Sequence, residues 1–293
     1  MDAQASGWLH HFEPFSTFHG VTLLACVLSI ALACWIGRTL RGLDQRSGGS
    51  RERTFIVGVA VLMFGFQAFA TGWRLLPSQF SIDESLPLHL CRVVGWVAPI
   101  ALLTGGARSR SILFFWGLGL STQGYITPVW TDGLASVGYW LFWVGHTVII
   151  GSAIYDLVVR GYTPSGRDLR FAAGAGMGFV GLVVGVNMAL GTNYCYLGQG
   201  DYGGRTVVDV LGDWPWRIAP MVLGAMFLFT ALYAGVGGVR WAVALPARLR
   251  LADAARERLP DIVVAEGAGT MVLGERKSEP IEAEQPEPAR RAA

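Results

Sequence analysis

The sequence predicts an all-α integral membrane protein, built as a bundle of seven transmembrane helices. Of its 293 residues 52% are hydrophobic and only 15% are charged, and Gly and Trp are abundant, with 39 and 11 copies. Soluble domains carry about a quarter charged residues, whereas Gly and Trp are enriched in membrane spans and at their interfaces. Soluble Rossmann, barrel and sandwich proteins are therefore excluded. With a net charge of +2 and no compact basic domain, the expected partners are membrane lipids and not nucleic acid.

Seven stretches are apolar and long enough, or nearly so, to cross the hydrocarbon core, which takes roughly 20 residues. They cover about 18–36, 54–76, 86–105, 111–128, 137–159, 171–190 and 218–239. The fourth is the weakest, because Gly117, Gly119 and Gly124 loosen it and Pro128 ends it. We divide the chain into an outer N-terminal arm (1–17), a transmembrane domain (18–240) and a cytoplasmic tail (241–293). The tail is expected to be largely disordered, because it is rich in Glu, Ala, Pro and Arg and has few aromatics.

The cationic residues predict the orientation of the bundle. Of the 23 Lys and Arg residues, 19 lie in the first, third and fifth connections and in the tail, and only Arg74, Arg205 and Arg217 lie on the opposite side. Because cytoplasmic loops collect Lys and Arg, we expect the N-terminus outside and the C-terminus in the cytoplasm, in the cell (plasma) membrane. Residues 1–17 have no cationic segment, so we expect no cleavable signal peptide.

Polar side chains inside spans are costly, so each is a candidate for function. In the predicted orientation six of them lie toward the outer half, which one outward-facing polar pocket would explain. They are His19, His89, Arg92, Gln123, His146 and Asn187. Asp156 is nearer the cytoplasmic end and is expected to face water or Arg160. In the outer loop 191–217, Asn193 and Tyr194 suit either a lid over the pocket or an aromatic belt that only seats the protein.

Cys91 is the candidate nucleophile of this pocket. The start of a helix and a neighbouring Arg92 both favour a thiolate. His89 and Arg92 are three residues apart and share a helix face, but Cys91 is about 200° from His89 around the helix. A partner for Cys91 would therefore come from another span, and His146 is the best candidate.

Other uses of the cysteines remain open. Cys91 and Cys195 both face the outer, oxidising side in this topology, where a disulfide between them would persist; Cys91 could also be a plain packed thiol. Cys26 and Cys34 are expected to be small apolar fillers. No His or Cys spacing typical of a metal site occurs, so we expect no metal. No cofactor is expected either: retinal needs a lysine inside the bundle, and Lys277 in the tail is the only one.

Several of these stretches together resemble the YwaF-type family of bacterial seven-span membrane proteins over about residues 12–240. The residues that carry the resemblance are Phe15-Ser16 with His19, Leu86 to Cys91, Gln123, Thr127-Pro128, Gly145-His146, Asn193-Tyr194 with Tyr196-Leu197, and Trp214-Pro215-Trp216. That family is distantly similar to a eukaryotic transmembrane family that moves acyl chains onto ether phospholipids with a membrane cysteine next to a histidine. An ungapped match on Pro87 places Leu88 at that cysteine, so His89 carries over better than Cys91.

These observations lead to one main hypothesis and two alternatives. The main hypothesis is acyl transfer or hydrolysis of a lipid, with Cys91 as nucleophile, His146 or His89 as general base and Arg92 holding a phosphate or an oxyanion. His19, Gln123, Asn187, Asn193 and Tyr194 are expected to bind substrate. A transporter is the first alternative, for which Gly95 and Pro99 could break the third span, although neither inverted repeats nor ion-coupling carboxylates are evident. A sensor or accessory protein, with the tail as its output, is the second.

Overall fold

The structure, a computed structural model, describes residues 7–199 and 207–258. Its α-helices are α2 (Thr17–Ser47), α3 (Arg51–Leu75), α4 (Leu90–Thr104), α5 (Ala107–Ile112), α6 (Gln123–Ile126), α7 (Val137–Val158), α8 (Gly166–Leu190) and α9 (Ile218–Arg258). In these ranges there are also a π-helix, η1 (Leu113–Leu120), two 3₁₀ helices, η2 (Tyr194–Tyr196) and η3 (Val207–Leu211), and a helical turn at residues 7–10. The prediction of an all-α protein is confirmed there. The chain divides into two units at Gly237–Gly238, and the sites below lie in the first.

Five helices of the described ranges are long and apolar enough to cross a membrane. They are α2, α3, α7, α8 and the part of α9 from Ile218 to Pro246. Three of them, α2, α8 and α9, contain the expected spans 18–36, 171–190 and 218–239, and α3 and α7 match 54–76 and 137–159 except for the last residue of each. Helix α9 continues to Arg258, so the first residues of the expected tail are helical. The rest of the tail lies outside the described residues.

The other two expected spans differ from the prediction. The segment 86–105 becomes helical only at Leu90, because residues 82–88 form turns before it, and the resulting helix α4 has 15 residues. The segment 111–128 is interrupted: η1 ends at Leu120, and a turn at Ser121 and Thr122 separates it from α6. The Ser121 N–H donates to the Trp116 carbonyl five residues earlier at 3.0 Å, which is the wide turn of a π-helix.

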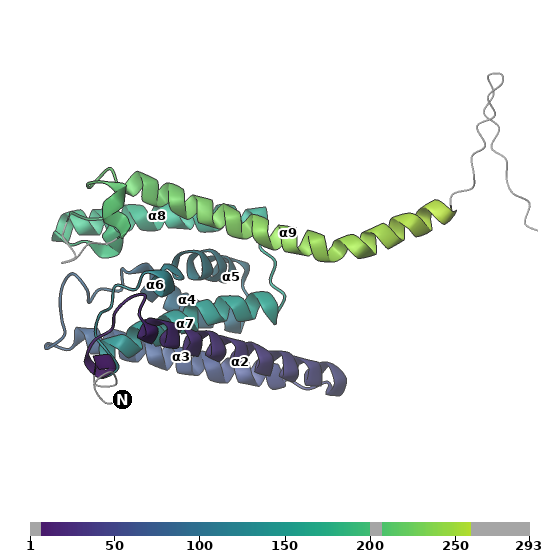
Figure 1. The fold of residues 1–293 in the computed structure, drawn as a ribbon, viewed down its shortest axis with the longest axis horizontal. Helices are drawn as coiled ribbons and strands as arrows, with labels where there is room; N and C mark the ends of the chain where they lie inside the picture. Colours follow the sequence, from purple (N-terminus) through teal and green to yellow (C-terminus); the bar gives the residue numbers. More distant parts are fainter. Residues whose placement is uncertain (1–6, 200–206, 259–293) are drawn as a thin grey trace, which may run out of the picture. The chain divides into compact units, whose positions relative to one another are not determined.

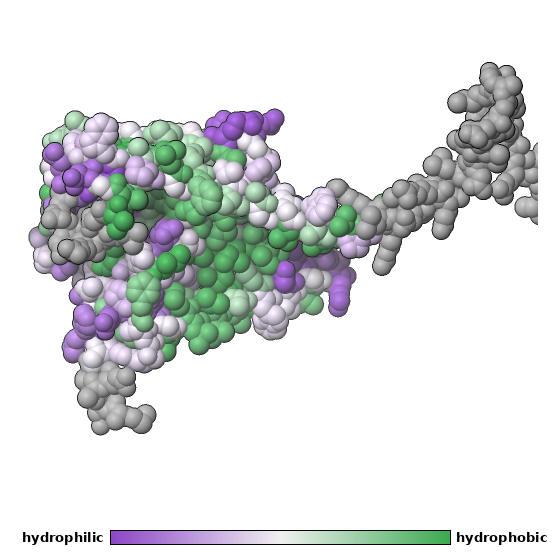
Figure 2. Space-filling view, turned by 45° about the horizontal axis from the view of Figure 1, so that its top comes forward, coloured by the Kyte–Doolittle hydropathy of each residue, from purple (hydrophilic) through white to green (hydrophobic). Residues whose placement is uncertain are grey.

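Helix α4 packs against α3, α7 and η1, α7 also packs against η1, and α2 packs against α3 and α7 (Figure 1). Their shared core includes Met63, Val94, Phe115 and Ile149, each at most 3% exposed. Large apolar side chains such as Leu62 and Phe227 are instead more than two-thirds exposed. On the face drawn in Figure 2, hydrophobic residues form a band with hydrophilic residues at either end. Such a surface suits contact with lipid.

The N-terminal arm is held against the segment that leads into α7. The Phe12 N–H donates to the Thr131 carbonyl at 2.6 Å, and the Leu134 N–H donates to the Trp8 carbonyl at 3.0 Å. Phe12 is fully buried and contacts Trp143 of α7, with 5.4 Å between ring centroids. Residues 8–12 and 131–135 therefore close around the start of α7.

Candidate functional site

Cys91 occupies the second position of helix α4. His89 is the N-cap residue, with an extended backbone and no side-chain capping bond, and Leu90 is the first helical residue. The N–H groups of a first helical turn have no acceptor within the helix, and they carry the positive end of its dipole. The Cys91 thiol is half-buried at this end. Its local setting therefore favours negative charge on the sulfur.

The structure places the side chains of Cys91 and His146 next to each other, close enough to interact electrostatically. His146 is buried in the middle of α7, and its Nδ1 lies 2.8 Å from the Phe142 carbonyl oxygen. A carbonyl oxygen can only accept, so Nδ1 carries the proton of the neutral ring and Nε2 is left as a proton acceptor. The pair has the parts of an activated nucleophile: a thiol, a base, and a backbone group that orients the base.

Helix α6 packs directly against the imidazole of His146. A Cβ atom placed on Gly124 would lie 2.5 Å from Nε2 of His146, which is far inside van der Waals contact. Only glycine leaves room for the ring in this position. The interruption of the fourth segment after η1 is what sets α6, and with it Gly124, beside the pair.

We expect Gly124→Ala to displace the His146 ring and to weaken its interaction with Cys91. Overpacking of this kind costs about 1–3 kcal/mol, and the rate at which Cys91 reacts with a thiol reagent should fall by about tenfold. Alkylation of Cys91 followed by mass spectrometry measures this rate. Gly181→Ala in α8 is the matched control, because no atom lies within 4 Å of the added Cβ. Equal rates in the two variants would contradict the packing argument.

Gln67 of α3 also belongs to this site, and it was not among the residues singled out in the sequence. Its side chain is buried, and Nε2 donates to the Arg92 carbonyl at 3.2 Å. A Cβ on Gly95 would lie 2.0 Å from the same nitrogen. Gly95 is one turn after Cys91 and on the same face of α4, so Gln67 lies on the face that carries the thiol. The one feature of the sequence that could have identified Gln67 is that its side-chain amide is a polar group within an apolar span.

Arg92 and His89 turn toward the loop that precedes α4. The Nη2 atom of Arg92 lies 3.1 Å from Oε2 of Glu84, and its Nη1 donates to the carbonyls of Glu84 and of Leu86. The Nε2 atom of His89 lies 3.3 Å from the same carboxylate oxygen. His89 is thus paired with Glu84, and His146 is the histidine that interacts with Cys91. Arg92 shapes the loop in this structure.

The pKa of Glu84 reflects this pairing. Partial burial alone would raise it, but the imidazole of His89, 3.3 Å away, and the positive charge of Arg92 hold the pKa below its ordinary value. A carboxyl group with a lowered pKa stabilises the folded state above its ordinary pKa, and this stability is lost as the pH falls through the folded-state pKa. The wild-type protein should therefore lose stability below about pH 4.3.

We expect Glu84→Gln to remove this part of the pH dependence. The carboxylate is half exposed, so its contribution should be at most about 1 kcal/mol. The measurement is the thermal midpoint Tm of both proteins in detergent from about pH 7 down to about pH 3. The Tm curves should converge at the acid end and separate at neutral pH. Curves that stay parallel throughout would show that Glu84 is not coupled to folding.

The loop after α8 folds through the side chains of Asn187, Asn193 and Tyr194. Asn187 accepts from the Tyr194 N–H at 2.8 Å and donates to the Tyr194 carbonyl at 3.0 Å. Asn193 accepts from the Gly198 N–H at 2.8 Å. Tyr194 is fully buried, its hydroxyl donates to the Ile82 carbonyl, and its ring packs edge-on against His89 at 5.1 Å. These residues join the loop to the start of α4.

His19 bonds to helix α6, and Gln123 is the first residue of that helix. The Nδ1 atom of His19 accepts from the Phe15 N–H at 3.0 Å, so its Nε2 carries the proton and donates to the Tyr125 carbonyl at 3.0 Å. Both ring nitrogens are thus bonded to backbone, and His19 ties the start of α2 to α6. Gln123 is exposed at the start of α6.

The disulfide that the sequence allowed between Cys91 and Cys195 is not formed. All four cysteines are free thiols. Cys195 has a left-handed backbone, with φ of 56°, and its Sγ lies 3.3 Å from the Leu88 carbonyl. Burial raises the pKa of the Cys195 thiol to about 12. Cys195 is therefore a protonated, poorly reactive thiol at neutral pH.

Asp156 lies at the opposite end of α7, where the sequence placed it near water or Arg160. It is 2% exposed. Its Oδ2 accepts from Nε of Arg110 at 2.7 Å, and its Oδ1 lies 3.6 Å from Nη1 of Arg160. Asp156 is a buried carboxylate between two arginines and joins α7 to α5.

Comparison with protein families agrees with this account of the fold. The model of the TMEM164 family, a family of transmembrane proteins, matches residues 14–233. The match carries that family's name and not the YwaF-type label. No curated protein and no solved structure matches the chain. The matched range begins just before α2, contains Cys91 and His146, and ends within the apolar part of α9. The chain therefore belongs to the TMEM164 family.

Proposed function

We propose that this member of the TMEM164 family transfers or hydrolyses a lipid acyl chain through Cys91 and His146. The observation that carries the proposal is that Cys91, at the start of α4, lies beside His146, whose Nδ1 is bonded to the Phe142 carbonyl. The proposal includes a cell-membrane location and seven crossings, with α4 and the interrupted α5–α6 segment added to the five long helices. The arginine distribution supports an N-terminus outside, so the pair would face an outward pocket.

The chemistry needs two steps. In the first, Sγ of Cys91 attacks the carbonyl carbon of an acyl ester while Nε2 of His146 takes the thiol proton. The tetrahedral oxyanion is stabilised by N–H groups of the first turn of α4. Its collapse breaks the ester C–O bond, leaves a thioester on Cys91, and returns the proton from His146 to the departing alcohol. In the second step a new alcohol, or water, attacks the thioester with His146 again as base, which restores the thiol.

The experiment is a search for the thioester on Cys91. The full-length protein in nanodiscs of phosphatidylcholine and phosphatidylethanolamine is expected to show an intact mass increased by one acyl group, and hydroxylamine should remove it. The adduct should be absent from Cys91→Ala and should persist in Cys195→Ala, the matched control in which the neighbouring thiol is removed. An unmodified Cys91 that also releases no fatty acid and no acylated product from these lipids would refute the proposal.

One observation favours a second candidate, a transporter. The α5–α6 segment is a discontinuous helix, broken at Ser121 and Thr122, and broken helices form substrate sites in transporters. Pro99, by contrast, lies inside the continuous helix α4. A transporter predicts movement of a lipid or solute across a sealed vesicle that does not depend on Cys91. The Cys91→Ala variant therefore separates the two candidates.

A further inference from the structure

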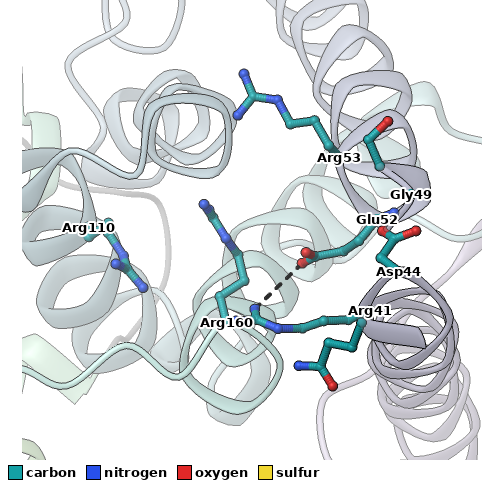
Figure 3. A pocket seen from close by; sticks show the side chains of 9 residues that line it. Arg41, Asp44, Gly49, Glu52, Arg53, Arg110 and Arg160 are labelled. Carbon is teal, nitrogen blue, oxygen red and sulfur yellow. Dashed lines mark hydrogen bonds and ion pairs between the residues drawn. The ribbon is translucent and has the colours of Figure 1, made fainter. Parts of the chain in front are cut away.

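Four arginines converge on a hollow far from Cys91 in the fold. Arg41 comes from α2, Arg53 from the start of α3, Arg110 from α5 and Arg160 from the residues after α7. Figure 3 shows the guanidinium groups of Arg53, Arg110 and Arg160 directed into a common space, with Arg41 paired to Glu52 at its edge. The hollow has a volume of about 590 Å³. It lies at the end of the bundle where the first, third and fifth connections, which are rich in arginine, are found.

The two carboxylates that line this hollow are committed to other groups. Both oxygens of Asp44 accept from backbone N–H groups at the start of α3, those of Arg51 and Glu52, at 2.9 Å. The Oε1 atom of Glu52 accepts from the Tyr155 hydroxyl at 3.2 Å and lies 4.0 Å from Arg41. The lining thus holds four positive and two negative charges. Asp156 does not line the hollow but pairs with Arg110 and Arg160, so the four arginines exceed the three nearby carboxylates by one charge.

The arginines also keep donors beyond those in their bonds. Arg41 and Arg53 each donate Nη1 to one carbonyl, those of Val159 and Leu103, at 3.1 Å. Within the described residues, Arg110 donates through Nε to Asp156, and Arg160 donates through Nη1 to the Leu102 carbonyl. A guanidinium group carries five N–H donors in a planar fork that matches the oxygens of phosphate. Carbonyl and carboxylate bonds thus hold the arginines in place while other N–H groups face the hollow.

An apolar crevice of about 170 Å³ is linked to the hollow through one hydrogen bond, from Tyr155 to Glu52. It lies between α2, α3 and α7, and its lining includes Ala33, Phe55, Gly151 and Tyr155. Tyr155 lines the crevice and donates to Glu52, which lines the hollow. A charged hollow with an apolar crevice linked to it fits a molecule that has an anionic head and an apolar chain.

We propose that this arginine hollow binds a phosphate group, and that the crevice holds an acyl chain when that phosphate belongs to a phospholipid. The phosphate oxygens accept from the guanidinium groups of Arg41, Arg53, Arg110 and Arg160. The site lies on the side of the membrane opposite to that proposed for Cys91 and His146. It is independent of their chemistry, so Cys91→Ala leaves its binding unchanged.

The experiment compares three probes on the full chain in detergent. Phosphatidylglycerol offers a phosphate and acyl chains, diacylglycerol offers the chains alone, and inorganic phosphate offers the head alone. Native mass spectrometry measures the lipid adducts, and the shift of Tm at constant ionic strength measures inorganic phosphate. We expect Arg53→Gln to weaken phosphatidylglycerol binding by about tenfold or more, because a hydrogen bond to a charged group is lost. Arg38→Gln is the matched control, since this exposed arginine also donates to a carbonyl but does not line the hollow.

A second variant separates the two sources of phosphate. Ala33→Leu fills the crevice and should weaken phosphatidylglycerol binding without changing the response to inorganic phosphate. If instead only inorganic phosphate binds and Arg53→Gln abolishes it, the phosphate site stands and its ligand is a soluble phosphate compound. The proposal is overturned if neither probe binds more tightly than diacylglycerol, or if Arg53→Gln and Arg41→Gln bind both probes as the wild type does.

Discussion

The His146→Ala variant is expected to react with a thiol reagent at Cys91 about a hundredfold more slowly than the wild type at neutral pH. In the wild type the Phe142 carbonyl fixes the proton on Nδ1, which leaves Nε2 to accept the proton of the thiol. Without this base the half-buried thiol must lose its proton to water. The measurement is the second-order rate of alkylation of Cys91, followed by mass spectrometry in nanodiscs.

A second substitution distinguishes lost proton transfer from lost packing. His146→Gln keeps a polar side chain of similar length that can still donate to the Phe142 carbonyl, but an amide does not take up a proton. It should be nearly as slow as His146→Ala while its Tm stays close to that of the wild type. A His146→Gln protein that alkylates at the wild-type rate would remove His146 from the role of base.

Asp156→Ala is expected to produce the largest loss of stability. It would leave the guanidinium groups of Arg110 and Arg160, each about one-fifth exposed, without their carboxylate. Removing one partner of a buried ion pair costs about 3–5 kcal/mol. The free energy of unfolding in mixed micelles, measured by titration with a denaturing detergent, gives this loss directly.

Asp156→Asn keeps one acceptor oxygen for the Nε atom of Arg110, so its stability should fall between the wild type and Asp156→Ala. Asp132→Ala is the control, because this exposed carboxylate bonds only to Ser136 in the described ranges at 3.1 Å and should matter little. If Asp156→Ala were as stable as Asp132→Ala, the buried ion pair would not hold α5 to α7.

The helices could be predicted from the sequence where a continuous apolar stretch is long enough to cross the membrane. The expected spans lie within α2, α8 and α9 and extend only one residue beyond α3 and α7, because a helix is one of the few structures that twenty apolar residues can form in a membrane. The interruption at Ser121 and Thr122 could not be predicted. It depends on a π-turn that the Trp116 carbonyl closes, and on a partner, His146, that is distant in the sequence.

The candidate site could likewise be predicted only in part from the sequence. Helical periodicity alone separates Cys91 from His89, and the structure brings Cys91 together with His146, the partner expected from another span. The surroundings of Arg92 could not be foreseen, since Glu84 reaches it through turns whose geometry is not encoded in residue spacing. Gln67 was missed because a single amide in an apolar span has no periodic signal. Its position depends on the space left by Gly95.

The closure of the N-terminal arm around the start of α7 has a consequence for assembly during synthesis. Residues 8–19 hold the segment 125–135 through the bonds of Trp8, Phe12 and His19, and this segment includes the end of α6, whose Gly124 abuts His146. More than a hundred residues separate the two halves of this closure. The environment of His146 is therefore completed only after α7 has left the ribosome and the arm has reached it. An affinity tag fused close to Trp8 should delay or distort this late step, whereas a tag after residue 258 should not.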